Sequence, residues 1–262
     1  MKKIFVIILC LVLTLACVSG CGRGGEGADD NDRGLLANHA IKKAAGLYGE
    51  AANRVKSEGA GFTKAEWQKI SDIQTNDRSD ITDRVLDIVA SHLLVNEEEA
   101  FRSKAVTAGR GETEKIKRLF PVYGKDYACI TEEKFDCISS SEYVKDGDIV
   151  EITLYFADVL NPAPDSPGFG QIMTPFNRES IIDAVKKYAF AVERDSVVFD
   201  LLYRGCYLKC VVDTRTSRII SMEQHMTADM SASAEAGLFG FTKEFSGTAV
   251  LESHLYFYDF VY

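Results

Sequence analysis

Two histidines near the C-terminal end of the sequence each follow a glutamate by two positions. Glu223 and His225 lie on one segment, and Glu252 and His254 on another. Both segments alternate apolar and polar residues, so side chains two apart share one face of a β-strand. If the two strands pair in register, the four side chains gather on one sheet face, as an acid and base pair or a weak metal site. A solvated face with cross-strand charge pairs is commoner, and we expect no metal, cofactor or catalytic residue.

Three methionines spaced by four lie on the opposite side of the first of these segments: Met222, Met226 and Met230. Methionine adapts to varied apolar partners, so the row is a candidate apolar groove for a lipid or a hydrophobic peptide. A core stripe is the simpler interpretation, because the alanines between the methionines let a helix sit close. The sequence favours the core and leaves the groove as the alternative.

Four cysteines follow residue 21, namely Cys129, Cys137, Cys206 and Cys210. An even number of cysteines is typical of disulfides in an oxidising compartment. Cys206 and Cys210 lie four apart in a predicted strand, so they share a face about 13 Å apart and cannot bond to each other. We therefore expect one or both to form a disulfide with Cys129 or Cys137. The cysteine spacings are not those of structural zinc sites.

The first twenty residues have the arrangement of an export signal. Lys2 and Lys3 precede an apolar run from Ile4 to Val18, which is typical of a secretory signal peptide. The run of about fifteen residues is shorter than the roughly twenty that cross a bilayer as a helix. We therefore expect residues 1–20 to be removed.

The four residues Val18-Ser19-Gly20-Cys21 resemble the bacterial lipobox, in which an aliphatic residue and two small ones precede a cysteine. This resemblance implies cleavage before Cys21 and a diacylglyceryl group on its thiol, with acyl chains such as palmitate as the anchor. Thr14-Leu15-Ala16-Cys17 is a poorer match because its first residue is polar, and an ordinary signal peptide cut near Gly20 is the other alternative. We expect a lipid-anchored protein on the extracytoplasmic face of the cell membrane.

The composition limits the classes of partner and reaction. The formal net charge is −9 at pH 7, and removal of Lys2 and Lys3 makes it more negative. Such a surface repels nucleic acid and anionic headgroups, so we expect no nucleic-acid partner. The sequence has no G-x-S-x-G, H-E-x-x-H or complete Walker glycine loop, which favours a protein that is not an enzyme. Catalytic groups that converge from distant positions are the alternative.

The sequence before residue 121 has mainly helical patterns. Residues 21–33, which begin with the lipidated cysteine, are rich in glycine and acid and predict a flexible tether. Apolar residues recur at three and four over Leu35–Val55, as on one face of a helix. Thr63 with Glu66 forms a capping box that predicts a second helix to about Ile73, and a third fits Asp80–Leu94.

From residue 121 the pattern is mainly that of β-strands. Asp146-Gly147 between two alternating segments is a strong hairpin signal, and a helix is predicted over 178–192. In the last seventy residues we predict long strands, far beyond the usual five or six residues, which must twist and curl. The predicted strand that starts near residue 220 has Ile220 on the same side as the methionines. The predicted strands are 134–143, 149–158, 197–203, 207–212, one starting near 220, and 245–261.

These patterns predict a single α+β domain over residues 34–262. A helical N-terminal part, residues 34–120, packs with a long-stranded, strongly curved antiparallel sheet that grips a helix, while residues 121–262 are mainly β with one helix. The lipobox, the acidic spacer, the segment 55–67 and the long hairpin that includes Val211-Val212-Asp213 together resemble a group of uncharacterised bacterial surface lipoproteins. That resemblance implies no activity.

The leading hypothesis for function is a surface-anchored, non-catalytic binding protein. Its ligand would be a lipid or another hydrophobic small molecule in the sheet, or a surface protein on its acidic outside. An envelope structural or inhibitor module without a ligand is the alternative. An extracellular hydrolase that uses His225, His254 and nearby carboxylates is less favoured.

Overall fold

The structure, a computed structural model, describes residues 30–76, 101–128, 132–164, 166, 168–188, 194–238 and 241–262. The chain divides into residues 1–36 and a compact unit of residues 37–262, and the second unit is described below. The export signal, Cys21, Cys129 and the helix predicted over 80–94 lie outside the described residues. None of the helices that the structure describes is long and apolar enough to cross a membrane.

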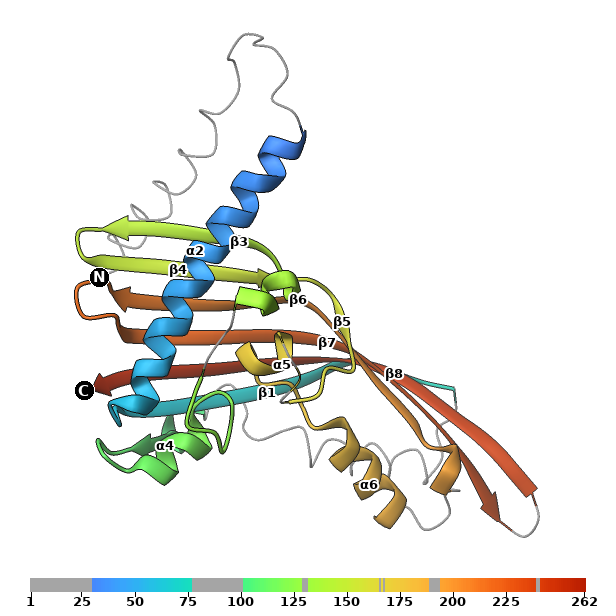
Figure 1. The fold of residues 1–262 in the computed structure, drawn as a ribbon. Helices are drawn as coiled ribbons and strands as arrows, with labels where there is room; N and C mark the ends of the chain where they lie inside the picture. Colours follow the sequence, from blue (N-terminus) through green and yellow to red (C-terminus); the bar gives the residue numbers. More distant parts are fainter. Residues whose placement is uncertain are drawn as a thin grey trace, which may run out of the picture. The chain divides into compact units, whose positions relative to one another are not determined.

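One antiparallel sheet of eight strands dominates the fold (Figure 1). Its order is β2-β1-β8-β7-β6-β4-β3, and β5 pairs with β6 beside this path. The strand that comes last in the sequence, β8, therefore lies between β1 and β7. The bounds are β1 (Gly61–Thr75), β2 (Val106–Ala108), β3 (Ile138–Asp146), β4 (Ile149–Phe156), β5 (Val159–Leu160), β6 (Val198–Asp213), β7 (Arg218–Leu238) and β8 (Phe241–Val261).

Few helices accompany the sheet. They are α2 (Asp30–Ser57), α4 (Thr113–Leu119), α5 (Phe169–Ile172) and α6 (Arg178–Tyr188), with short 3-10 turns η2 (Phe101–Lys104), η3 (Glu132–Cys137) and η4 (Arg194–Ser196). Figure 1 shows α2 crossing one face of the sheet, which we call the core face. The chain is thus a mixed helix and sheet protein in which the antiparallel sheet predominates.

Small residues let α2 lie close to the core face. Its alanines at positions 44, 45, 51 and 52 are fully buried, and Tyr48 between them is almost fully buried. All belong to one apolar cluster with the inward side chains of β4, β6, β7 and β8. The helix ends at Ser57, Gly59 just after it has a φ of +62°, and the Ala60 N–H donates to the Val55 carbonyl at 2.9 Å. This is the left-handed termination that glycine permits.

The predicted helical N-terminal part is not supported, and the helix predicted from Thr63 to about Ile73 is wrong. The Leu35–Val55 helix lies within α2, but the capping-box segment that starts at Thr63 lies in β1 instead of a helix. Strand β1 pairs with β2 on one side and with β8 on the other. Hydrogen bonds to two neighbouring strands therefore override the local capping signal, which contributes only about 1 kcal/mol.

The methionine row lies in the core. Met222, Met226 and Met230 are 3%, 1% and 6% exposed, and all three belong to the main apolar cluster. They therefore do not line an open groove. The predicted position of Ile220 on their side is wrong, because the register shifts there, Ile219 is buried and Ile220 is 45% exposed. Strict alternation cannot reveal this extra residue.

A second bulge joins the two strands predicted over 197–203 and 207–212 into the single strand β6. Gly205 has a φ of +60°, and the register with β7 shifts around it. The shift places Cys206 and Cys210 on the core face, where both are buried. A glycine in this conformation is typical of the extra residue of a β-bulge.

The predicted disulfides are wrong for the cysteines that the structure describes. No disulfide joins Cys137, Cys206 and Cys210, because no two of the described cysteines lie at disulfide distance. Burial raises the pKa of Cys137 and of Cys206 to about 11, and that of Cys210 further. An even count of cysteines did not indicate pairing because the bulged strand directs two of them into the apolar core. Buried thiols of this kind are unreactive.

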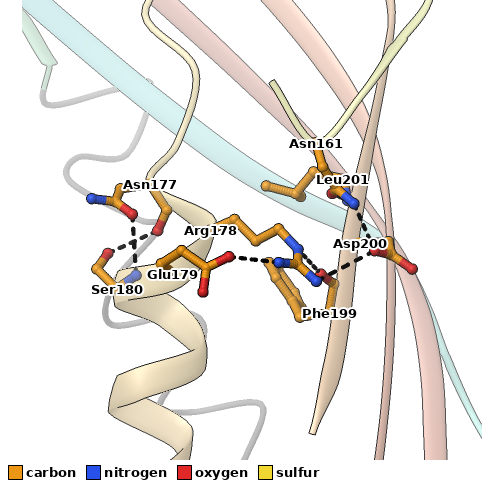
Figure 2. A network of polar contacts seen from close by, with 8 residues as sticks. All are labelled: Asn161, Asn177, Arg178, Glu179, Ser180, Phe199, Asp200 and Leu201. Carbon is orange, nitrogen blue, oxygen red and sulfur yellow. Dashed lines mark hydrogen bonds and ion pairs between the residues drawn. The ribbon is translucent and has the colours of Figure 1, made fainter. Parts of the chain in front are cut away.

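The hairpin predicted around Asp146-Gly147 is confirmed as β3–β4, with Gly147 at a φ of +59°. Strand β4 pairs with β6 only as far as Tyr207. Beyond the short β5, side chains protect the β6 edge, as Figure 2 shows. Arg178, at the start of α6, donates from Nε to the Phe199 carbonyl, and Asn161 Oδ1 accepts from the Leu201 N–H at 2.8 Å. These contacts fasten α6 to the sheet and satisfy an edge that would otherwise be open.

Candidate functional site

Five aromatic or imidazole rings form a row across the outer face of the sheet, the face opposite α2. They come from five neighbouring strands, and each residue lies directly opposite the next in register. The row runs Tyr155 (β4), Tyr207 (β6), His225 (β7), His254 (β8) and Trp67 (β1). Neighbouring ring centroids are 6.4, 4.9, 4.3 and 4.2 Å apart. We call these five residues the ring row.

Two imidazoles and one carboxylate converge at the centre of the ring row. His225 Nδ1 lies 3.0 Å from His254 Nε2, and Glu252 Oε1 lies 2.8 Å from the same His254 nitrogen. The nearest ligand atoms of the three residues all lie within 4.8 Å of one another. The side chain of Glu252 is 39% exposed and that of His254 is 12% exposed, so the group is accessible from the carboxylate side.

The other ring nitrogens of the two histidines also have polar neighbours. His254 Nδ1 lies 3.8 Å from Glu223 Oε1 and 3.3 Å from the Tyr256 hydroxyl. His225 Nε2 lies 3.2 Å from the Thr227 hydroxyl. Both rings are therefore oriented by contacts on each side as well as by stacking within the row.

The pKa values of the two histidines are shifted in opposite directions. Hydrogen bonds to His254 hold the pKa of Glu223 and of Glu252 below the usual range, although burial acts in the opposite direction. Burial, followed by the charge of His254, lowers the pKa of His225. Burial also disfavours the charged form of His254, but hydrogen bonds to the two glutamates outweigh it and raise the pKa of this histidine. The cluster therefore favours two carboxylates, one charged imidazole and one neutral imidazole.

The hydroxyl of Tyr207 connects the ring row to this cluster. It donates to Glu223 Oε1 at 3.0 Å. Burial, followed by the charge of Glu223, raises the pKa of Tyr207 to about 12. Tyr207 is therefore a hydrogen-bond donor to the carboxylate and keeps its proton at neutral pH.

The structure brings together the four side chains that the sequence singled out. The sequence predicted this cluster if the two strands pair in register, and His225 does lie directly opposite His254. Sequence reasoning missed the flanking rings Trp67 and Tyr207. Trp67 had been assigned to a helix, and the Gly205 bulge hid the continuity of the strand that carries Tyr207.

Lys56 is another unusual titratable group, away from the ring row. It is buried, and its Nζ donates to the carbonyls of Val122, Lys125 and Tyr127 at 2.7, 3.0 and 3.0 Å. Burial lowers its pKa to about 8. Because three carbonyls use all three protons of the ammonium, Lys56 fastens the loop after α4 to α2 and is not placed to attack a substrate.

A hollow of about 520 Å³ lies further along the outer face, beside the ends of β1 and β6. Its lining is mainly hydroxyl and amide groups, and its one carboxylate, Asp200, contacts Arg178 and Asn161 (Figure 2). None of the described residues that line it is an aromatic residue or a histidine. The cluster around His225 and His254 is therefore the stronger candidate site.

Two kinds of chemistry are open to this cluster. Imidazoles and carboxylates in contact can move a proton, with one group as acid and another as base. The same lone pairs, on atoms that lie within 4.8 Å of one another, can hold a cation. The chain matches no protein-family model, no curated protein and no solved structure.

Proposed function

We propose that this chain is a membrane-anchored, extracytoplasmic lipoprotein that acts by non-catalytic binding, with the ring row at the centre of its binding surface. One observation carries the choice of surface. The core face is occupied by α2 and by the chain's own apolar side chains, whereas the outer face holds exposed and half-buried polar groups. We also propose that the long-stranded sheet curves around α2.

The anchor is supported by the signal sequence and by the lipobox-like residues before Cys21. Intact mass of the protein from membranes tests it, beside a Cys21→Ser variant. We expect a diacylglyceryl-sized addition on the native protein and release of the variant from the membrane. A free Cys21 thiol in the native protein contradicts the anchor. It leaves the proposal of a binding surface on the outer face unchanged.

A ligand on the outer face is favoured over a lipid in the sheet. The methionines that could have lined a lipid groove are buried against other parts of the chain. Solvent extraction of the purified protein followed by lipid mass spectrometry separates these two versions. We expect no lipid beyond the covalent anchor. A stoichiometric second lipid would restore the hydrophobic-ligand hypothesis.

Histidine footprinting tests the binding surface itself. Diethyl pyrocarbonate modifies accessible imidazoles, and His39 on α2 is an exposed reference on the same chain. We expect His225 and His254 to react more slowly on intact cells than in the purified protein, relative to His39. Equal relative rates in both samples would mean that nothing occupies the ring row in the cell, and would refute this surface.

A hydrolase is the second candidate, and one contact favours it. The Thr227 hydroxyl lies 3.2 Å from His225 Nε2, and His225 in turn contacts His254 beside Glu252. This is the order of hydroxyl, base and orienting groups in nucleophilic catalysis. Turnover of p-nitrophenyl acetate by the native protein, lost in Thr227→Val, would support the hydrolase. Equal rates for the two proteins would remove it.

A further inference from the structure

We propose that His225, His254 and Glu252 bind one divalent transition-metal ion of the zinc or copper type on the outer face of the sheet. This inference rests on the proposed function and names the chemical class of its ligand. It does not depend on the lipid anchor. Three observations support it: the positions of the donor atoms, their shortage of protons, and the fixed orientation of both imidazoles.

The donor atoms are close to the spacing that a metal requires. Zinc binds imidazole nitrogen at about 2.0–2.1 Å and carboxylate oxygen at about 2.0–2.2 Å, which places tetrahedral donors about 3.3 Å apart. Here His254 Nε2 is 3.0 Å from His225 Nδ1 and 2.8 Å from Glu252 Oε1. The two contacts at His254 Nε2 need to lengthen by only a few tenths of an ångström around an ion, and the donor atoms of His225 and Glu252 lie within 4.8 Å of each other. Two nitrogens and one oxygen suit zinc and copper better than magnesium or calcium.

The short hydrogen bonds at His254 Nε2 do not satisfy the three donors, and the only other nitrogen of this ring that can carry a proton, Nδ1, lies at a longer 3.4 Å from His225 Nδ1. His254 Nε2 carries at most one proton, yet it faces both His225 Nδ1 and Glu252 Oε1. If this nitrogen donates to Glu252, the His225 nitrogen can only share the same proton. If it instead accepts from His225, two lone pairs face each other across 2.8 Å at ionised Glu252. A cation at the centre satisfies all three groups at once.

The surroundings hold both imidazoles in place. Trp67 stacks on His254 with an interplanar angle of 14°, and Tyr207 stacks on His225 with an angle of 21°. The nitrogens turned away from the cluster contact polar oxygens, among them Glu223 Oε1 at 3.8 Å from His254 Nδ1. A carboxylate behind a metal-bound histidine fixes its tautomer and raises its basicity. The ligands therefore come from two central strands that the sheet keeps in register.

Charge also favours a cation at this point. Two carboxylates lie beside His254, with Glu252 Oε1 2.8 Å from Nε2 and Glu223 Oε1 3.8 Å from Nδ1. The whole chain carries a formal charge of −9, so it attracts cations at long range. A dication balances the two carboxylates without requiring a proton on either histidine.

Calorimetric titration of the purified full-length chain, without a histidine tag and after chelator treatment, tests the site. The probes are Zn²⁺, Cu²⁺ and Mg²⁺ as chloride salts. We expect one equivalent of Zn²⁺ or Cu²⁺ to bind and Mg²⁺ to give no saturable signal. His225→Gln, His254→Gln and Glu252→Gln should each weaken binding by at least about 100-fold, and Glu223→Gln by about 10–100-fold.

His39→Gln is the matched control, because it removes an exposed histidine on α2 and leaves the cluster intact. Its affinity should equal that of the native chain. Thermal unfolding of every variant verifies that it is folded. X-ray absorption of the zinc-loaded native chain, expected to report two imidazole nitrogens, does not depend on any variant.

Absence of binding in the native chain, or equal weakening by His39→Gln, overturns the metal site. Footprinting keeps this result separate from the proposed function. Protection of His225 and His254 on intact cells that persists after chelator treatment indicates a macromolecular partner without a metal. Protection that disappears with chelator supports the ion as the ligand.

Discussion

Strands β7 and β8 present two faces that share a backbone and differ in chemistry. On one face Met226 and Leu251 are buried among apolar side chains beneath α2. On the other face, one residue along each strand, Thr227 and Glu252 lie directly opposite each other beside the histidines. The core face gains its stability from excluded water. The outer face contributes less to folding, so its residues are free to serve binding.

The largest expected effect is a cavity in the core face. Met226→Ala should lower the free energy of unfolding by about 2–5 kcal/mol, because it removes a buried side chain from a packed core. Thr227→Ala, the next residue, should lower it by less than about 1 kcal/mol. Urea unfolding of both variants measures the difference. Equal losses of unfolding free energy would mean that the core face does not contribute more to stability than the outer face.

A smaller effect is expected at Gln224, a fully buried glutamine of the core face. Gln224 accepts from the Thr174 hydroxyl at 2.7 Å and donates to the Ile172 carbonyl at 2.8 Å. Thr174→Val leaves the Gln224 oxygen buried without this donor and should cost about 1–3 kcal/mol in urea unfolding. Thr174→Ser keeps the hydroxyl and should stay closer to the native value. A valine variant as stable as the serine variant would show that this bond is not needed.

The Gly205 bulge keeps the two faces in phase, and its replacement should have a moderate effect. A Cβ at Gly205 meets nothing within 4 Å, so the φ of +60° is the main source of strain. Gly205→Ala should therefore lower the free energy of unfolding by about 1–2 kcal/mol.

Gly46 in α2 gives the matched control, since a Cβ there also meets nothing within 4 Å. Gly46→Ala should raise stability by up to about 1 kcal/mol through helix propensity. Thermal unfolding of the two variants should shift in opposite directions. Shifts of the same sign would contradict a conformational origin.

The smallest expected effect is a pH dependence where α2 meets the start of β7. Arg218 donates to Glu58 Oε2 through Nε at 3.1 Å and Nη2 at 2.8 Å, and the hydrogen bond lowers the pKa of Glu58. The stability from this pair is present above the ordinary glutamate pKa. It is lost as the pH falls through the lower pKa of the folded state.

Glu58→Gln and Arg218→Gln should each flatten the same part of the acid-side stability profile. The double variant should flatten it no further than Glu58→Gln alone, which removes both the Arg218 contact and the hydrogen bond from Arg54 at 3.1 Å. Urea unfolding between about pH 3 and about pH 6 measures the slopes. Additive changes would show that the pair does not act as one unit.

The sequence predicted the sheet better than the helices. Long alternating runs predicted β7 and β8 because one face of each strand is buried over most of its length. The segment from Thr63 was misassigned because a capping box is a local signal, whereas β1 is stabilised by two strands remote in sequence. The extra residue at Ile220 escaped prediction because alternation carries no record of a bulge.

The sequence predicted the candidate site only on the condition that the two strands pair in register. Two glutamate–histidine pairs on alternating strands predicted which side chains could meet, and the register decided that they do. The stacked rings of Trp67 and Tyr207 could not be foreseen, since they depend on the order of strands in the sheet. The disulfides failed for a similar reason, because the count of cysteines does not tell which face of a strand they occupy.

The central position of β8 has a consequence for the order in which the chain can fold. Thr63 near the start of β1 pairs with Tyr258 near the end of β8. Strand β1 therefore cannot gain this neighbour until the ribosome has made nearly all of the sequence shown. Pairing between such distant segments is slow, because a large loop must close first. We expect β1 to complete its place in the sheet only after β8 has been made, later than the β3–β4 hairpin, whose two strands are adjacent in the sequence.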